Sequence, residues 1–246
     1  MKIKTDINLY FSGSGLTEDR CNDFVKLYEI AESVFSDSYT YKDLQEASFK
    51  NAGPGESAVR TLIPLFKLMG FVEYSKSSTF NFTDDGRIFY YMQKSISEAV
   101  KATFPQKESV IRNLEEATTK LYWKGFMRLL DSDDDNGRKF RIAYSLFSHF
   151  HEINWNEYLY SLILVLGEEQ QDVQEAISRI EVNRSNNVTY EIQAKGKNGQ
   201  YDFVASTATS YMKSILETAG LIENAEKSNT SRITNRFHKF QEYVNC

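Results

Sequence analysis

The sequence predicts a mainly helical α+β protein in which two winged-helix domains, each with a small β wing, are joined by a connecting helix. The main observation is a short pattern that occurs twice, 150 residues apart. Composition agrees with two compact cores, since 41% of the 246 residues are hydrophobic and 14% are aromatic. The chain contains only three prolines, which favours helices. The two copies of the pattern read LMGFVE at residues 68–73 and TAGLIE at residues 218–223.

Each copy of the pattern is typical of a helix end followed by a strand. Gly70 and Gly220 follow amphipathic stretches, and glycine adopts the left-handed conformation that ends a helix with little steric cost. A hydrophobic pair and a polar stretch come next, as expected for a strand and a turn that would form a wing. The order helix, glycine, strand, turn, strand indicates a winged helix, and the alternative is two unrelated helix-to-strand connections. The segments concerned are the helices 57–69 and 210–219, the polar turns 75–78 and 227–229, and the return strands 79–83 and 230–234.

The first domain is expected over residues 1–104, including an extended N-terminal arm of about eighteen residues. Its first helix covers 23–35, where the apolar residues fall on one helical face. A second helix starts at Thr40 or Tyr41 and carries Leu44, Ala47 and Phe49 on its apolar side. A turn at 53–56 leads to the third helix, the expected recognition helix, and a closing helix follows over 84–102.

Pro64 complicates the third helix, because proline removes a backbone hydrogen bond and bends a helix. Two solutions are open. Either the helix is kinked at Pro64, or it starts later than Ser57.

The segment 105–137 is expected to hold the connecting helix, from about 107 to 130, and an acidic loop. The loop DSDDDNG at 131–137 was weighed as a calcium site and as a solvated turn. A calcium loop starting at Asp131 would place Asn136 where glycine is needed and Ile142 where a bidentate glutamate is needed. The missing ligands favour the turn.

The second domain is expected over residues 138–246, with apolar helices at 140–150 and 155–166. An insertion then interrupts the winged core. It consists of an amphipathic helix around 173–180 and a hairpin whose strands, 188–192 and 201–204, flank a turn at 196–199. The lysine at the hairpin tip could contact a nucleic-acid backbone, although a plain solvated turn is the favoured interpretation.

The formal net charge of −5 argues against strong nonspecific binding to nucleic acid, because that affinity comes from Lys and Arg on phosphates. Residues 195–240 carry seven Lys or Arg and four acids, which is a net +3 against −8 for the remainder. The second winged unit is therefore the better electrostatic candidate. A basic partner subunit could supply further charge, and a protein-binding role would explain the acidity directly.

No pattern for catalysis, a cofactor or a metal is found, so we do not expect this chain to be an enzyme by itself. A metal-dependent nuclease needs paired carboxylates and a lysine, and the nearest triplet, Asp85-Gly86-Arg87, has the wrong base. His149 and His151 point to different faces of a helix. A hydrolase with an unfamiliar constellation remains a third alternative. No secretory or membrane-spanning run is seen, so a cytoplasmic location is expected, nucleoid-associated if the protein binds DNA.

Four segments together resemble the recognition region of type IIS restriction endonucleases of the FokI kind. They are YKDL at 41–44, GESAVR at 55–60, LMGFVEY at 68–74 and FTDDG at 82–86. The resemblance covers roughly residues 38–92, and 138–244 more faintly. It implies winged-helix-like subdomains that read DNA. Since no cleavage domain is expected here, it implies a specificity module, a lone recognition subunit or a fragment of a restriction endonuclease, for which a separate nuclease or other protein subunit is a candidate partner.

The sequence therefore predicts a sequence-specific module for double-stranded DNA, with a winged-helix protein-interaction scaffold or a regulator-like protein as the alternative. Recognition helices place basic and hydroxyl side chains against base edges, while wings contact the backbone. The candidate contacts are Ser57, Arg60, Thr61 and Lys76 in the first domain, and Ser206, Thr207, Thr209, Ser210, Lys213, Lys227, Asn229 and Arg232 in the second.

Overall fold

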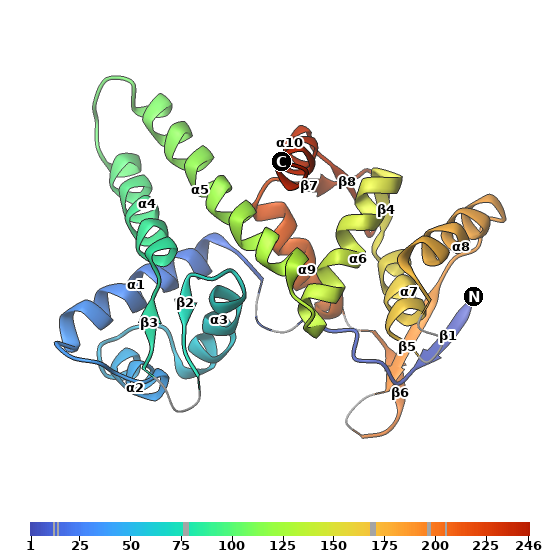
Figure 1. Cartoon of the computed structure of the whole chain (residues 1–246), viewed down its shortest axis with the longest axis horizontal. Coiled ribbons are helices and arrows are strands. Elements are labelled where there is room, and N and C mark those ends of the chain that lie inside the picture. The colour runs from blue at the N-terminus through green and yellow to red at the C-terminus, as the bar shows by residue number, and fades with distance from the viewer. Residues whose placement is uncertain (12, 14, 76–78, 168–170, 196–197, 205) are drawn as a thin grey trace. The chain divides into compact units, whose positions relative to one another are not determined.

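The computed structural model describes residues 1–246 except 12, 14, 76–78, 168–170, 196–197 and 205. The protein is mainly helical with small sheets, in agreement with the predicted class (Figure 1). It divides into an N-terminal unit, residues 12–129, and a C-terminal unit formed by residues 1–11 and 130–246. Each unit is described by itself below.

The N-terminal unit places three helices before a short hairpin and two long helices after it. β2 and β3 pair antiparallel, with Val72 opposite Phe82, and Thr40 forms a single bridge with Thr79. The chain just before the second helix therefore lies beside the return arm of the hairpin. The elements are α1 (Glu18–Val34), α2 (Tyr41–Lys50), α3 (Glu56–Leu68), β2 (Val72–Glu73), β3 (Asn81–Phe82), α4 (Asp84–Lys101) and α5 (Lys107–Asp131).

Aromatic side chains form the core of the N-terminal unit. The Phe24 ring on α1 contacts Phe66 of α3 at 4.5 Å between ring centroids and Phe89 of α4 at 5.2 Å. Phe71 and Phe82, from the hairpin, complete the cluster around Phe24. All five rings are buried, so the helices and the hairpin share one core whose apolar area stabilises the unit.

α3 runs through Pro64 without interruption and begins at Glu56. The alternative of a later start is therefore wrong. Gly55, with an extended backbone, is the N-cap, and Val59 donates its N–H to the Gly55 carbonyl at 3.0 Å. Because proline has no N–H, the carbonyl of Arg60 lacks its usual helical donor four residues later.

The C-terminal unit holds a second arrangement of helices with a small sheet, and a separate sheet built from the insertion. In the first sheet the order is β4-β8-β7, all antiparallel. The insertion contributes the predicted helix and hairpin. The elements are α6 (Asp135–Phe150), β4 (Glu152–Asn154), α7 (Trp155–Leu166), α8 (Val173–Ser185), β5 (Glu191–Lys195), β6 (Tyr201–Phe203), α9 (Thr207–Thr218), β7 (Ile222–Asn224), β8 (Thr230–Ile233) and α10 (Asn235–Val244).

The first residues of the chain belong to the C-terminal unit, whereas the sequence placed them with the first domain. β1 (Lys2–Thr5) pairs parallel with β5, with Ile3 opposite Ile192, and the sheet order is β1-β5-β6. The following residues are fixed to α6 by Lys139, whose fully buried ammonium donates to the Tyr10 carbonyl at 2.8 Å. Pairing between segments about 190 residues apart leaves no local signal in the sequence.

The acidic segment before α6 serves as a helix cap. Asp134 is the N-cap residue, and its carboxylate accepts the N–H of Gly137 at 2.7 Å. Asp135 forms an ion pair with Lys139 at 2.6 Å. α6 thus starts a few residues before the expected domain boundary at 138. Among the described residues, no group of three His, Cys, Asp or Glu side chains is placed to hold a metal ion.

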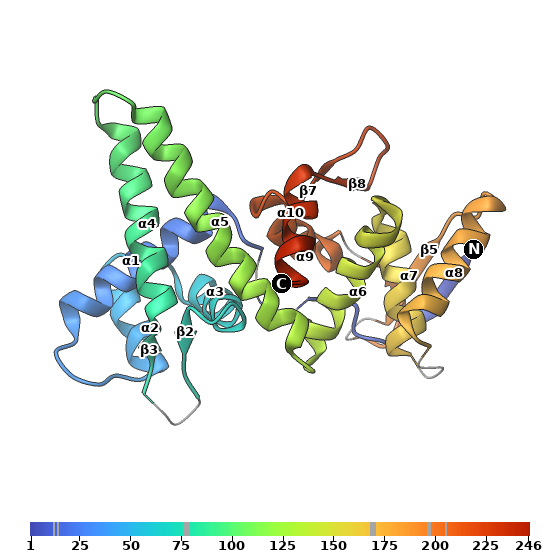
Figure 2. The same cartoon turned by 45° about the horizontal axis from the view of Figure 1, so that its top comes forward.

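The duplicated pattern has the same local structure in both units. Gly70 and Gly220 have positive φ angles of 73° and 68°. The residue after each glycine donates its N–H to the carbonyl five residues earlier, at 2.8 Å for Phe71 and 2.9 Å for Leu221. Figure 2 shows each glycine-ended helix, α3 or α9, followed directly by its hairpin.

Candidate nucleic-acid interface

The candidate interface in the N-terminal unit is the outward face of α3. Its inward face is apolar and fully buried, which fixes the rotation of the helix about its axis. Ser57 and Arg60 lie on the exposed side, as predicted. The buried residues of α3 are Val59, Leu62, Ile63, Leu65 and Phe66.

Arg60 is the basic side chain best placed to meet a ligand. It is exposed, and within the described part of the chain it forms no hydrogen bond or ion pair. Glu56 lies one turn earlier on the same helical face. Thr61, by contrast, is half-buried, and its hydroxyl donates to the carbonyls of Ser57 and Ala58 at 3.3 and 3.0 Å. The Thr61 hydroxyl therefore already bonds within its own helix.

Stacked tyrosines connect the start of α2 with the hairpin, beside Lys67 of α3. The rings of Tyr41 and Tyr74 are 5.0 Å apart and nearly parallel, and the Lys67 ammonium lies 4.6 Å from the centre of the Tyr74 ring. Lys67 also donates to the Tyr74 carbonyl at 2.7 Å. Burial raises the pKa of Tyr41 to about 12, the neighbouring Tyr74 adds to this, and the charge of Arg60 opposes it. This stack fixes the start of the hairpin relative to α3.

The hairpin of the N-terminal unit borders an open hollow of about 750 Å³ lined by Gly70, Tyr74 and Arg128, among others. Arg128 is occupied inside the unit, since it donates to the Met69 carbonyl at 3.2 Å and to Asp85 at 3.1 Å. Lys76, the predicted wing contact, lies outside the described residues.

The predicted basic contacts of the C-terminal unit all face polar or acidic groups of that unit. Lys213 on α9 donates to the Asn224 side chain at 2.6 Å and lies 3.8 Å from Glu217. Arg232 pairs with Glu223 at 2.8 Å, and Lys227 lies 4.0 Å from Glu152. These three predicted contacts are thus already engaged within the unit.

The predicted polar contacts of the C-terminal unit differ in how far their side chains are exposed. Thr209 is buried and donates to the Ser206 carbonyl at 3.2 Å, so its assignment as a surface contact is wrong. Ser206 is exposed and Ser210 is half-buried, while the side chain of Thr207 lies outside what the structure describes. Asn229 occupies the turn between β7 and β8 with a φ of 55°, and its side chain is exposed.

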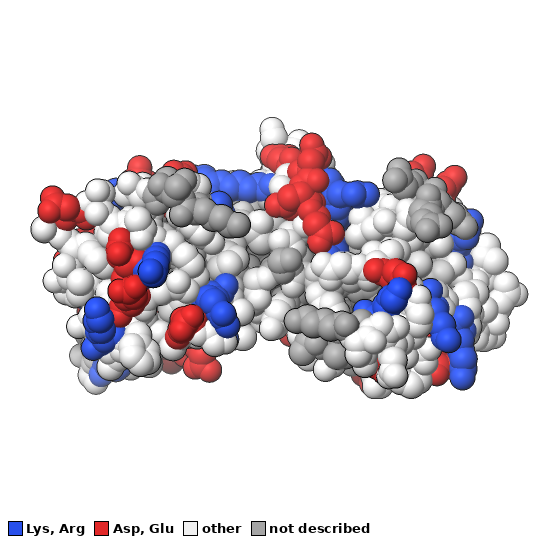
Figure 3. Space-filling model, turned by 90° about the horizontal axis from the view of Figure 1, so that it is seen from below, with Lys and Arg blue, Asp and Glu red and all other residues white. Residues whose placement is uncertain are grey.

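Charged side chains of both signs are scattered over the face seen in Figure 3, and no large patch of one sign forms there. On this face, recognition of a polyanion would therefore depend on individual basic side chains. This face has no continuous basic surface.

The exposure of Phe49 on α2 was not expected from the sequence. Its side chain is 77% exposed, the highest value among the large apolar side chains of the described residues. Leu44, Ala47 and Ser48 form the buried face of α2 instead. The signal was present, because Phe49 is five residues from Leu44 and so falls off the three-to-four spacing of a buried helical face.

Comparison with known proteins yields no match, neither to a family model, nor to a curated protein, nor to a solved structure. Among the described residues, no helix combines the length and apolar character needed to cross a bilayer.

Proposed function

We propose that this chain is a sequence-specific recognition module for double-stranded DNA, built from two winged helices in tandem, with α3 as its principal recognition helix. Its resemblance to the recognition regions of FokI-type endonucleases supports a role as the specificity part of a restriction or defence system. Cleavage would then belong to a separate nuclease.

The order and pairing of the elements support the winged-helix assignment. In the C-terminal unit, a helix, a short strand and a helix precede α9 and a two-stranded wing, and the first strand pairs with the last in the order β4-β8-β7. In the N-terminal unit, the Thr40–Thr79 bridge occupies the position of the β4–β8 pairing. The same order of elements therefore underlies both units, with α8 and the β5–β6 hairpin inserted in the second.

The observation that carries the DNA-binding proposal is Arg60, an exposed guanidinium on the outward face of α3 with no partner among the described residues. Arginine donates two hydrogen bonds to guanine in the major groove, and it neutralises phosphate when it contacts the backbone. The predicted contacts Lys227 and Arg232 of the C-terminal unit must first leave acidic neighbours. Exposed ion pairs are weak, so Lys227 and Arg232 can still contact the backbone, as secondary contacts.

Replacement of Arg60 tests the proposal directly. Arg60→Ala removes the unpaired guanidinium from the outward face of α3, so we expect about tenfold weaker binding to duplex DNA at low salt. Binding would be measured by fluorescence anisotropy with duplexes enriched on the wild-type protein from a randomised library. Arg112→Ala is the matched control, because Arg112 is an exposed arginine of the same unit on α5.

The control variant distinguishes a specific contact at Arg60 from a general effect of net charge. Equal losses for Arg60→Ala and Arg112→Ala would show that only net charge matters and would remove α3 from the proposal. Unchanged binding by Arg60→Ala would do the same.

A protein-interaction scaffold is the second candidate, and one observation favours it. Three large apolar side chains of α4 are exposed, namely Ile88 at 44%, Tyr91 at 60% and Val100 at 55%. Exposed apolar side chains can mark protein contacts. Absence of retention on duplex DNA at low salt, together with isolation of a stable complex with another protein, would favour the scaffold.

A further inference from the structure

We propose that residues 1–11 form a latch that opens while the rest of the C-terminal unit stays folded, and that Lys139 is the residue that locks it closed. We call residues 1–11 the N-terminal strap. This role does not depend on the proposed DNA-binding function. It belongs to a segment of the C-terminal unit that precedes the whole N-terminal unit in the sequence.

The N-terminal strap determines whether the N-terminal unit is anchored at one end or at both. Residues 12–129 form the N-terminal unit, and they lie in the sequence between the two parts of the C-terminal unit, 1–11 and 130–246. The chain therefore passes between the units twice, after residue 11 and after residue 129. A docked strap anchors both passages in the C-terminal unit, whereas an open strap leaves only the second passage anchored. Opening thus changes a double tether into a single one.

Lys139 connects the two passages. Its ammonium donates to the Tyr10 carbonyl at 2.8 Å, just before the first passage, and to the Asp135 carboxylate at 2.6 Å, in the first turn of α6 and shortly after the second. The Lys139 side chain is fully buried, and a charged donor forms a stronger hydrogen bond than a neutral one. Leu9 and Phe11, on either side of Tyr10, are buried as well. The strap is therefore held most firmly at its end.

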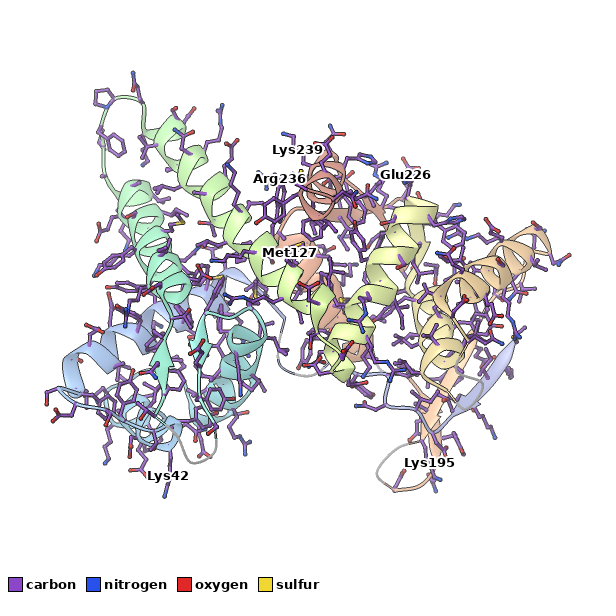
Figure 4. The ribbon with its side chains drawn as sticks, viewed as in Figure 1. Lys42, Met127, Lys195, Glu226, Arg236 and Lys239 are labelled. Atoms are coloured by element: carbon purple, nitrogen blue, oxygen red, sulfur yellow. The ribbon has the colours of Figure 1, made fainter. Side chains whose placement is uncertain are left out.

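The beginning of the strap is held at the protein surface. β1 is an edge strand that pairs with β5 in the order β1-β5-β6 (Figure 1). Lys2 lies 3.4 Å from Glu191, with 82% of the Lys2 side chain exposed. Lys195, at the end of β5 (Figure 4), lies 3.3 Å from Asp6, which also accepts a hydrogen bond from Tyr201. Because exposed ion pairs contribute little, the contacts at the end of the strap decide whether it stays docked.

Opening of the strap leaves the main core of the C-terminal unit in place. The sheet β4-β8-β7 is built from residues 152–154, 222–224 and 230–233, so the strap contributes no strand to it. Segments with few buried contacts open at a lower free energy than the whole protein. The strap meets this condition, since its buried side chains are Thr5, Leu9 and Phe11. We therefore expect a local opening that is separate from global unfolding.

Hydrogen exchange of the full chain tests the latch. We expect peptides of the strap to exchange faster than peptides of α7, whose Trp155 and Tyr158 side chains are fully buried. Low concentrations of urea should accelerate exchange in α7 and hardly change it in the strap, because a local opening exposes little surface. Equal protection of the two segments in the wild type would overturn the latch.

Replacement of Lys139 tests the lock. Lys139→Met leaves the Tyr10 carbonyl without this donor, so we expect about tenfold faster exchange at β1 and unchanged exchange in α7. Glu191, whose N–H donates to the Met1 carbonyl at 2.8 Å, should follow β1. Unchanged exchange at β1 would overturn the role of Lys139. Equal acceleration at β1 and in α7 would overturn the latch, because it would indicate a general loss of stability.

Arg141→Met is the matched control, because Arg141 is also a basic residue of α6 that donates to a backbone carbonyl, in this case that of Leu130 at 2.8 Å, outside the strap. It should leave exchange at β1 unchanged, and an acceleration there as large as that of Lys139→Met would overturn the lock. Leu9→Ala tests the latch if Lys139→Met does not fold, since it removes a buried anchor of the strap. It should accelerate exchange at β1 alone, and equal acceleration in α7 would overturn the latch.

Discussion

At the scale of single residues, the two glycines of the duplicated pattern differ in what surrounds them. A Cβ atom at Gly70 would lie 1.1 Å from the Arg128 guanidinium, which Asp85 and the Met69 carbonyl hold in place. At Gly220 the nearest atom would be the Arg236 guanidinium at 2.8 Å. The Arg236 side chain is exposed and forms no ion pair or hydrogen bond within the described residues, so it can move aside.

This difference predicts that a glycine-to-alanine substitution lowers the free energy of unfolding more at Gly70 than at Gly220. Both positions have positive φ, which strains any residue with a Cβ atom. We expect Gly220→Ala to lower the free energy of unfolding by about 1 kcal/mol and Gly70→Ala by about 2–3 kcal/mol, since only Gly70→Ala also displaces a bonded arginine. Urea unfolding followed by hydrogen exchange in peptides of each unit would measure both values. Equal losses would contradict the packing described at Gly70.

Side-chain pairing also limits what can be predicted about the site. Arg60 and Ser57 were found from the sequence because an amphipathic helix assigns its exposed face by spacing alone. Lys213 and Arg232 look equally suitable in the sequence, but their partners, Asn224 and Glu223, lie on β7. These two partners on β7 follow from the fold and could not be read from spacing, whereas the contact of Lys213 with Glu217, four residues later on α9, could.

At the scale of elements, α5 is held against α4 by a charged cluster. Asp85, in the first turn of α4, accepts hydrogen bonds from Lys124 at 2.7 Å and Arg128 at 3.1 Å, both on α5. The Asp85 side chain is only 12% exposed, while the Lys124 and Arg128 side chains are about half exposed. Arg128 also reaches the end of α3 through the Met69 carbonyl, so one carboxylate connects three helices.

Neutralising this carboxylate should loosen α5. We expect Asp85→Asn to lower the free energy of unfolding of the N-terminal unit by about 1–2 kcal/mol. This is the contribution of a hydrogen bond between charged groups, made smaller because the Lys124 and Arg128 side chains are partly exposed to solvent. Exchange in peptides from 107–131 should accelerate. Asp84→Asn is the control, because Asp84 pairs with Arg87 at 3.1 Å but is 92% exposed. A comparable effect of both variants would contradict the role given to Asp85.

Several elements were predictable because their signals are local. The glycine stops, the helices α4 and α5, and the β5–β6 hairpin follow from residues close in sequence. The pairing of β1 with β5 was not predictable, because it joins Lys2 to Glu191. The start of α6 was missed by a few residues, since the acidic run that was interpreted as a turn includes its cap, Asp134.

At the scale of the whole molecule, the formal net charge of −5 opposes DNA binding and so confines it to local contacts. An acidic chain binds DNA best where basic side chains without acidic partners meet phosphates. The structure offers such bases around α2 and α3, with Lys50 and Arg60 exposed and unpaired among the described residues. We therefore expect few phosphate contacts and a modest dependence of affinity on salt.

The affinity of the wild-type chain for duplex DNA, measured as a function of salt concentration, tests the central claim most directly. We expect binding at low ionic strength and a linear fall of the logarithm of the association constant with the logarithm of the salt concentration, with a slope of roughly −2 to −4 for a few phosphate contacts. Binding that is absent at low salt, or that does not change with salt, would contradict it.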